Sequence, residues 1–281
     1  MPALYAHYRF GQEVIKALPL CFSNHVEQFP EAFALGTQGP DILFYRHPLK
    51  KNEIRSHGTY LHAIAAEGFY LDMAALLLEN CKGETAEEIL TQNGAFSAYV
   101  CGFMCHFALD VSCHKYIDDN SSKKPTHGKI ESEFDKFLLK KDGKPIRGYN
   151  TATPIKDEND AGMACAKALK LPKENISTAI KSMRKINGWF SKKCGFFHAV
   201  MHLLLKIVGM ERKFGDMFIH KKDDPLCKEI NTVLYGKLEA AIPMGAGLIE
   251  EYFSSLPTLL KKRKMNDIFR YNYSGIKITE E

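Results

Sequence analysis

The stretch that decides the fold is CHFALDVSCH, residues 105–114. It places His106, Asp110 and His114 at successive steps of four residues. Residues four apart on an α-helix lie about 40° apart around the axis and about 6 Å apart along it, so these three side chains form one polar line. The residues around them are apolar and recur at three and four, which predicts a helix over 96–117.

The same helical spacing recurs along most of the chain, whereas alternating, strand-like runs are scarce. Further helices are predicted over 60–78, 131–139, 160–169, 174–190, 196–210, 226–241 and 246–261. Pro172, Pro225 and Pro243 stand between these segments, where helices should begin or end. We therefore expect an all-α protein of eight to ten helices.

The stretch KKDGKPIRGYNTATPIKD, residues 140–157, is rich in turn formers and charge and has no helical period. It predicts a long loop or a boundary between two halves of the chain. A length of 281 residues is compatible with one large helical domain or two smaller ones.

The composition is that of a soluble globular protein, with 45% hydrophobic and 25% charged residues. The formal charge of +5 favours anionic partners such as phosphates or lipid headgroups. It falls short of the dense basic stripe of a nucleic-acid binder.

The sequence predicts neither export nor a membrane span. No apolar run approaches the roughly 20 residues of a transmembrane helix, and the first residues lack the charged and apolar regions of a signal peptide. The eight cysteines form no compact framework and are interpreted as reduced thiols. We expect a cytoplasmic protein.

The polar line on the predicted helix is typical of a metal site. His106 and His114 would lie about 12 Å apart at the backbone, too far to share one ion comfortably, whereas Asp110 between them could bridge two ions. His127 and Glu131 repeat the four-residue step. Imidazole and carboxylate together are the ligand set expected for zinc in a hydrolytic site.

The alternative is that each of these histidines is a hydrogen-bonded core residue. For any single histidine this alternative is the better one. For five such groups at helical spacing among apolar residues it is costly, because buried ionisable groups need partners, and metal ions supply them.

The ordered series of eight polar residues resembles the zinc-dependent phospholipase C family, whose relatives include single-strand-specific nucleases. The series is His7, Asp41 (at the end of GTQGPD), His62, His106, Asp110, His114, His127 and Glu131. The resemblance covers about the first half of the chain. It implies a multi-helix bundle of that family's type, with a metal-binding region over 1–145 and additional helices over 146–281, packed together as one globular unit.

The resemblance also implies how these residues bind two or three zinc ions. One zinc is assigned Asp41, His62, His106 and Asp110, the second is assigned His114, His127 and Glu131, and the third is assigned His7, a bridging Asp110 and the chain's own terminus. The chemistry it implies is attack of a metal-activated water on phosphorus, with Asp41 and Asp110 as catalytic residues and no protein nucleophile.

The chain departs from the family pattern at two places in its first half, and its second half shows no motif of the family. The family holds its third metal with an N-terminal Trp that export processing exposes, whereas this chain begins Met1-Pro2. We hypothesise that Met1 is trimmed and that Pro2 offers its secondary amine. His114 also follows Asp110 more closely than the family's usual gap.

Several residues with metal-binding chemistry are assigned structural roles instead. HAVMH, residues 198–202, lacks the Glu of a metalloprotease helix. Cys101, Cys105 and Cys113 are better explained by packing. Taken alone, Asp41 would be a helix N-cap. The aromatic residues Trp189, Phe190, Phe196 and Phe197 are interpreted as core rather than as a lipid-docking face.

The sequence leaves three functions open. The favoured one is phospholipase C-like cleavage of phospholipid headgroups at a membrane surface. The second is a metal-dependent nuclease or nucleotide phosphatase, which an aromatic stacking pocket beside the metals would favour. The third is a catalytically inactive, metal-stabilised interaction protein. The oligomeric state stays open.

Overall fold

A computed structural model describes residues 4–79, 81–207, 209, 215–262 and 265–279. In these residues the protein is built from helices, and one isolated bridge joins Tyr271 to Lys277. The all-α prediction is confirmed. The α-helices are α1 (Leu4–Ala17), α2 (Leu20–Gln28), α3 (Pro30–Gly36), α4 (Glu53–Ala63), α5 (Glu67–Leu78), α6 (Ala86–Asn93), α7 (Ala95–Asn120), α8 (His127–Lys141), α9 (Ala161–Leu169), α10 (Lys173–Phe190), α11 (Gly195–Ile207) and α13 (Lys228–Lys262).

Short 3₁₀ helices complete the described chain: η1 (Gly39–Tyr45), η2 (Gly215–Met217), η3 (Pro225–Cys227) and η4 (Asp267–Arg270). The described residues hold more helices than the eight to ten expected, because α1 to α3 and α6 lie outside the predicted ranges and the predicted helix over 60–78 is divided into α4 and α5. The predicted loop over 140–157 lies between α8 and α9. The prediction for 208 and 210 at the end of 196–210 falls outside the described residues.

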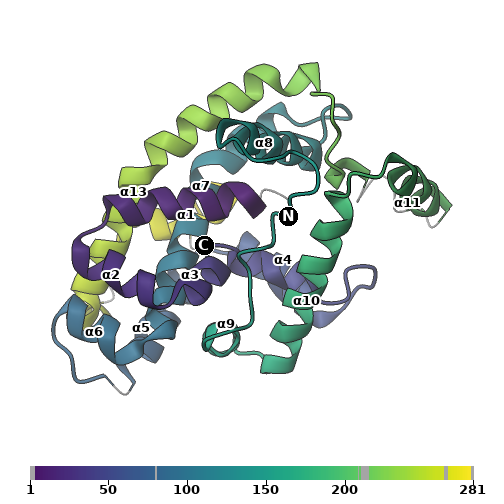
Figure 1. Ribbon diagram of the computed structural model, residues 1–281. Helices are drawn as coiled ribbons and strands as arrows, with labels where there is room; N and C mark the ends of the chain where they lie inside the picture. The colour runs from purple at the N-terminus through teal and green to yellow at the C-terminus, as the bar shows by residue number, and fades with distance from the viewer. Residues whose placement is uncertain (1–3, 80, 208, 210–214, 263–264, 280–281) are drawn as a thin grey trace.

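The central helix of the protein is α7, which packs most extensively against α3 and α13 (Figure 1). By length and composition α7 is apolar enough to cross a membrane, which we did not expect from the sequence. However, 89% of its most apolar window is buried inside the protein. A helix that is apolar all round is also what the core of a large helical protein requires.

Two glycines let α3 and α7 approach backbone to backbone. A Cβ added at Gly36 would lie 2.2 Å from the carbonyl oxygen of Tyr99, and one added at Gly102 would lie 2.2 Å from that of Phe33. No side chain fits at either position. The close approach brings the chain that follows α3, and with it η1, directly against the middle of α7.

Where the sequence predicted one helix over 60–78, the structure has α4 and α5, bent by 108°. Ile64 adopts an extended conformation at the break. The C-terminal segment supplies the missing hydrogen bonds: the Ala66 amide donates to the carbonyl of Tyr271, and the Tyr273 amide donates to the carbonyl of His62. The break therefore places His62 at the end of a helix, beside the C-terminal segment.

The prediction that helices end at Pro243 is wrong, because α13 continues through Pro243 and Pro257. A proline inside a helix costs about 3 kcal/mol or more in stability. The helix is held along its length by packing on α1, α5, α7 and α8. Its buried apolar side chains include Leu234, Leu238, Ile249, Phe253 and Leu256.

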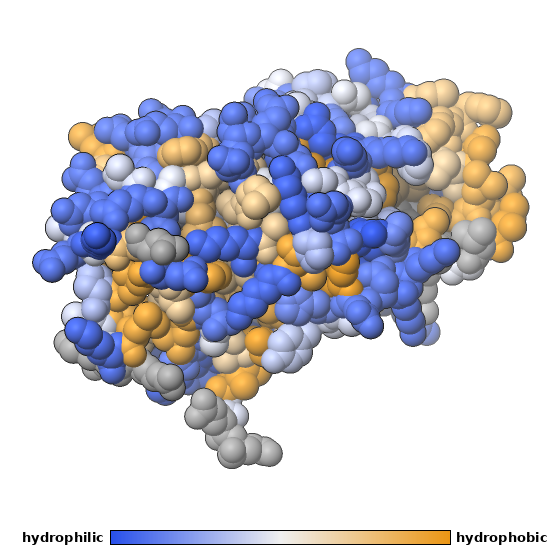
Figure 2. Space-filling model, turned by 90° about the horizontal axis from the view of Figure 1, so that it is seen from below, coloured by the Kyte–Doolittle hydropathy of each residue, from blue (hydrophilic) through white to orange (hydrophobic). Residues whose placement is uncertain are grey.

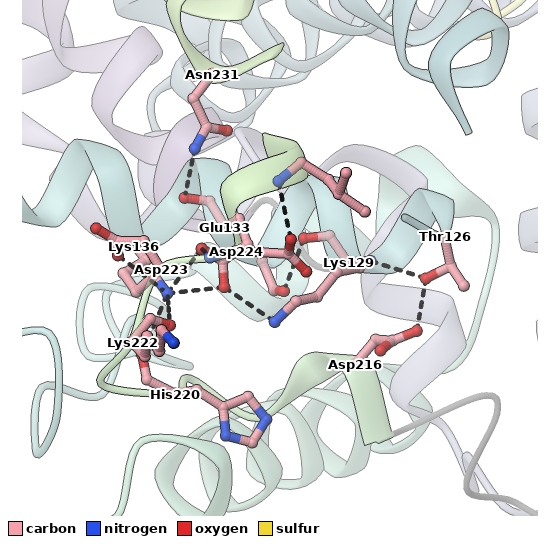
Figure 3. A network of polar contacts seen from close by, with 12 residues as sticks. Thr126, Lys129, Glu133, Lys136, Asp216, His220, Lys222, Asp223, Asp224 and Asn231 are labelled. Carbon is pink, nitrogen blue, oxygen red and sulfur yellow. Dashed lines mark hydrogen bonds and ion pairs between the residues drawn. The ribbon is translucent and has the colours of Figure 1, made fainter. Parts of the chain in front are cut away.

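One face of α8 is fixed to the chain between η2 and α13 by a buried charged network (Figure 3). The Lys136 ammonium is 2% exposed and donates to the Glu133 carboxylate at 2.7 Å, and to the carbonyls of Lys222 at 2.9 Å and His220 at 3.2 Å. Lys129 donates to the same carboxylate at 2.9 Å. The network connects the two regions that the sequence divided near residue 145.

A second contact fixes α1 to α8. The Asp135 carboxylate accepts the amides of Tyr5 at 3.1 Å and Ala6 at 2.8 Å, which are unpaired donors in the first turn of α1. Burial raises the pKa of Asp135 to about 8, whereas the two amide hydrogen bonds and the helix N-terminus favour its ionised form. The contact sets α1 so that His7 lines the same small cavity as Glu131.

Candidate metal centre

Asp110 lies at the centre of the candidate site, 2% exposed in the middle of α7. Its Oδ2 is 3.0 Å from Nε2 of His106, one turn before it, and its Oδ1 is 3.3 Å from Nε2 of His114, one turn after it. His7 reaches the same carboxylate from α1, with its Nε2 3.2 Å from Oδ1. Three imidazoles thus converge on one buried carboxylate.

On one side of Asp110, η1 and α4 add two further groups. Oδ1 of Asp41 lies 3.2 Å from Nε2 of His62. Asp41, His62 and His106 present ligand atoms that all lie within 4.8 Å of one another. Asp41 stands inside η1, whose N-cap is Gln38, so a helix-capping role does not account for it.

On the other side, α8 adds its first helical turn. Oε1 of Glu131 lies 3.1 Å from Nε2 of His127 and 3.5 Å from Nε2 of His114. Thr126 caps α8 by accepting the Lys129 amide at 3.1 Å, which starts the helix at His127 and orients the pair. His114, His127 and Glu131 form another group with all ligand atoms within 4.8 Å.

His7, His106 and Asp110 form a further such group. All eight side chains of the predicted series therefore lie together, drawn from α1, η1, α4, α7 and α8. His106 is shared by two groups. Pro2, the hypothesised additional ligand, lies outside the described residues.

The second ring nitrogen of each of three histidines lies against a backbone carbonyl. These contacts join Nδ1 of His62 to Gly58 at 2.7 Å, Nδ1 of His106 to Thr37 at 3.1 Å, and Nδ1 of His114 to Tyr273 at 3.0 Å. A carbonyl oxygen only accepts, so each Nδ1 carries a proton and donates it. In the neutral ring, Nε2 then offers its lone pair toward a carboxylate oxygen, which is also an acceptor.

Two facing acceptors repel each other unless a proton or a cation lies between them. Histidines that bind metals almost always donate their other ring N–H to a carbonyl or carboxylate, which is the arrangement seen here. His127 makes the corresponding contact with a carboxylate, since its Nδ1 lies 2.7 Å from Oδ1 of Asp118. A cavity of about 20 Å³ beside His7, Asp110, His114 and Glu131 has room for one water-sized occupant. These residues fit zinc.

The site's electrostatics favour a bound cation. Burial would raise the pKa of Asp110, but the imidazoles of His106, His114 and His7 hold it well below its ordinary value. Burial would likewise raise the pKa of Glu131, and the neighbouring His127 and His114 lower it. Both carboxylates are therefore ionised in a buried setting, where a negative charge requires a compensating cation.

Zinc binding is expected to strengthen as pH rises. Burial lowers the pKa of His114, but Asp110 and Glu131 outweigh this and raise it to about 9 without metal. The protonated His114 ring stabilises the folded, metal-free protein. This contribution is complete below the ordinary histidine pKa of 6.5 and is lost as pH rises through about 9. Because zinc needs the neutral ring, each displaced proton gives about a tenfold change in apparent affinity per pH unit.

Competition with a chromophoric chelator between pH 6 and 8, together with titration calorimetry in two buffers of different ionisation enthalpy, measures this proton release. An affinity that does not change with pH, and a heat that does not depend on the buffer, would contradict the assignment of His114.

Gly39→Ala is expected to weaken zinc binding by about tenfold or more, as losses around metal ligands commonly do. Gly39 has a φ of 49°, and an added Cβ would lie 2.3 Å from Cδ2 of His106. Alanine is strained at this φ and displaces the His106 ring. In the control Gly68→Ala, the added Cβ meets nothing within 4 Å. Metal content after dialysis distinguishes them, and equal content would exclude a role for Gly39.

Among the described residues, those set aside from the sequence belong to none of these groups, although Cys113 lines the cavity beside Asp110 and His114. His202 stacks on His220 at 5.8 Å, and both His198 and His202 contact the ring of Phe218. Cys101, Cys105 and Cys113 are buried, and burial raises the pKa of each thiol above its ordinary value.

Sequence analysis missed the residues that hold the ligands in place. Asp118 and Asp135 could have been found, because each continues a four-residue step, Asp118 after His114 and Asp135 after Glu131. The roles of the Thr37 and Tyr273 carbonyls cannot be predicted from side-chain patterns, since any residue type supplies a carbonyl.

Comparison with known proteins agrees with this geometry. A sequence model of the family described as zinc dependent phospholipase C matches residues 6–186. The matched range includes all eight side chains of the site and ends within α10. No curated protein and no solved structure matches the chain.

Proposed function

Because the chain belongs to the zinc-dependent phospholipase C family, we propose that it hydrolyses phosphodiesters, and in particular cleaves phospholipid headgroups. The observation that carries the proposal is the convergence of imidazole Nε2 atoms on the buried carboxylates of Asp110 and Glu131. Such a constellation needs a proton or a cation between the facing atoms, and it is built from the residues that a zinc-dependent hydrolase needs.

We assign the ligands by the three groups that the side chains form. Asp41, His62 and His106 make one group, His114, His127 and Glu131 the second, and His7, His106 and Asp110 the third. Two or three zinc ions fit this arrangement. When bound, zinc lowers the pKa of a water and neutralises charge on the phosphoryl oxygens.

The protein's own residues orient and shield the site. The backbone carbonyls that accept from His62, His106 and His114 fix the ring positions before substrate arrives, so little reorganisation is needed during the reaction. His106 and Asp110 are almost fully buried, which keeps bulk water from one side of the site.

The opposite side of the site is open to solvent. The side chains of Asp41, His62 and His127 are 14%, 19% and 36% exposed. A phosphodiester therefore approaches along the edge formed by η1, α4 and the start of α8. Burial would raise the pKa of Asp41, but its hydrogen bond with His62 contributes to holding it below its ordinary value, so the carboxylate is ionised at this edge.

The test is hydrolysis by the full chain purified with zinc. We expect turnover of a soluble chromogenic phosphodiester and of phosphatidylcholine vesicles, complete loss with a chelator, and recovery on addition of zinc. Release of phosphorylated headgroup identifies phospholipase C-type cleavage. Turnover that continues after removal of zinc would contradict the proposal. Hydrolysis of dinucleotides but not of lipids would favour the nuclease function instead.

A further inference from the structure

Helix α11 carries an apolar stripe that no part of the described chain covers. Phe196, Val200, Leu203 and Ile207 are separated by steps of four, three and four residues, which places them on one helical face. Their exposed fractions are 79%, 39%, 59% and 71%. Large apolar side chains gathered in this way usually mark an interaction site.

The opposite face of α11 anchors it to the protein. Leu205 is buried in a small cluster with Phe190, Met217 and Phe218, and His198 contacts the ring of Phe218. Figure 1 shows α11 at the margin of the molecule, beyond α10. In Figure 2 apolar side chains form a continuous patch at that same end. The stripe thus faces outward on a helix that is held in place.

An apolar groove of about 640 Å³ lies between α10, α11 and the loop at residues 47–50. Apolar walls come from Leu49, Trp189, Met201 and Leu204, among others. Leu49 is itself 61% exposed. The groove is wide enough for a hydrocarbon chain, because ligand pockets of comparable volume hold small molecules.

The surface around the stripe and the groove is basic. From Asn175 to Met210 the sequence contains no Asp or Glu, and its basic residues are Lys181, Arg184, Lys185, Lys192, Lys193 and Lys206. Lys50 and Lys185 line the groove. Lys192 lies over the ring of Phe197, 4.1 Å from its centroid, so a cation stands directly beside the apolar surface.

We propose that α11 docks the protein on an anionic lipid bilayer, with the stripe buried at the boundary between headgroups and acyl chains. An apolar helical face flanked by lysines is typical of helices that lie in a membrane interface, and each Lys or Arg near an anionic surface adds to the attraction. The inference rests on the proposed function for its purpose, since an enzyme that cleaves phospholipids must reach a bilayer. The family match ends at residue 186, before α11.

Vesicle sedimentation with the zinc-loaded full chain tests the stripe. We expect binding to phosphatidylserine-containing vesicles. The affinity of the variant Phe196→Ser/Leu203→Ser/Ile207→Ser should be about tenfold or more lower, because each replaced side chain loses the favourable free energy of its transfer from water to lipid. The matched control is Leu20→Ser/Leu226→Ser/Ile276→Ser, at positions that are 76%, 56% and 56% exposed elsewhere. The control should bind like the unaltered protein.

The contribution of the lysines and the depth of insertion into the bilayer are measured separately. Lys192→Gln/Lys193→Gln/Lys206→Gln should weaken binding to anionic vesicles about tenfold or more, and added salt should weaken binding of the unaltered protein. Trp189, the one tryptophan of the chain, lines the groove and should be quenched by lipids brominated on the acyl chain. Equal binding by the stripe variant and the unaltered protein, or no quenching of Trp189, would overturn the inference.

Two further measurements separate this inference from the proposed function. The stripe variant should hydrolyse the soluble phosphodiester at the unaltered rate, since α11 carries no group of the metal centre. Vesicle binding without hydrolysis would support docking and contradict the proposed hydrolase activity. Hydrolysis without vesicle binding would support the activity and contradict docking. Self-association without lipid that the stripe substitutions abolish would assign the face to a second copy and overturn the lipid assignment.

Discussion

Asp110→Asn is expected to abolish zinc-dependent turnover, with a fall in kcat/KM on the order of 10³-fold or more. Loss of an outer partner of a metal ligand alone costs about 10–100-fold in metal affinity or activity, and Asp110 faces three imidazoles directly. Asparagine keeps the shape of the side chain and removes its charge. The three Nε2 atoms and any bound zinc then lose the anion at the centre of the site.

The matched control is Asp119→Asn. Asp119 lies on the same helix, is 58% exposed and pairs with the exposed Lys115, so its loss should leave turnover and metal content unchanged. Metal analysis, circular dichroism and kcat/KM on a soluble phosphodiester are measured for both variants. Retention of zinc and activity by Asp110→Asn would remove Asp110 from the site.

Lys136→Met is expected to lower the free energy of unfolding by about 3–5 kcal/mol, the range found when one partner of a buried ion pair is removed. Lys136 is 2% exposed and has three kinds of partner: Glu133, Asp223 and two backbone carbonyls. Methionine fills the space of the aliphatic stem but leaves the Glu133 carboxylate, among the described residues, with Lys129 as its remaining cation.

Urea unfolding of the zinc-loaded protein measures the effect. Lys140→Met is the control, because Lys140 is 42% exposed where it pairs with Asp223, and exposed pairs contribute about 0–1 kcal/mol. The double variant Glu133→Gln/Lys136→Met should be more stable than Lys136→Met, since it also removes the buried carboxylate that has lost one of its cations. If Lys136→Met costs no more than Lys140→Met, the network in Figure 3 does not fix α8.

The local part of the site could be predicted from the sequence. His106, Asp110 and His114 share one face because four-residue steps on a helix are fixed by helix geometry, and the same holds for His127 and Glu131. That Asp41 and His62 approach the same place follows from no local pattern. The resemblance to the family suggested it, and in the structure it depends on the close contact of α3 with α7.

The errors have physical causes that a single sequence does not reveal. The break between α4 and α5 is stabilised by Tyr271 and Tyr273, some two hundred residues later in the chain. Pro243 stays inside α13 because tertiary packing outweighs the local cost of proline. Among the aromatic residues interpreted as core, Phe190 is 6% exposed, but Phe196 is 79% exposed. Apolar composition alone does not distinguish a core from a docking face.

The ligands come from five helices that are spread along the sequence from His7 to Glu131. Each ion would therefore act as a reversible cross-link between distant points of the chain, closing loops whose entropy the unfolded chain would otherwise retain. A ligand that binds only the native state also stabilises it in proportion to the logarithm of its free concentration. The lifetime of this protein in a cell would then depend on the supply of zinc, and scarcity of the metal would lower both the amount of folded protein and its activity.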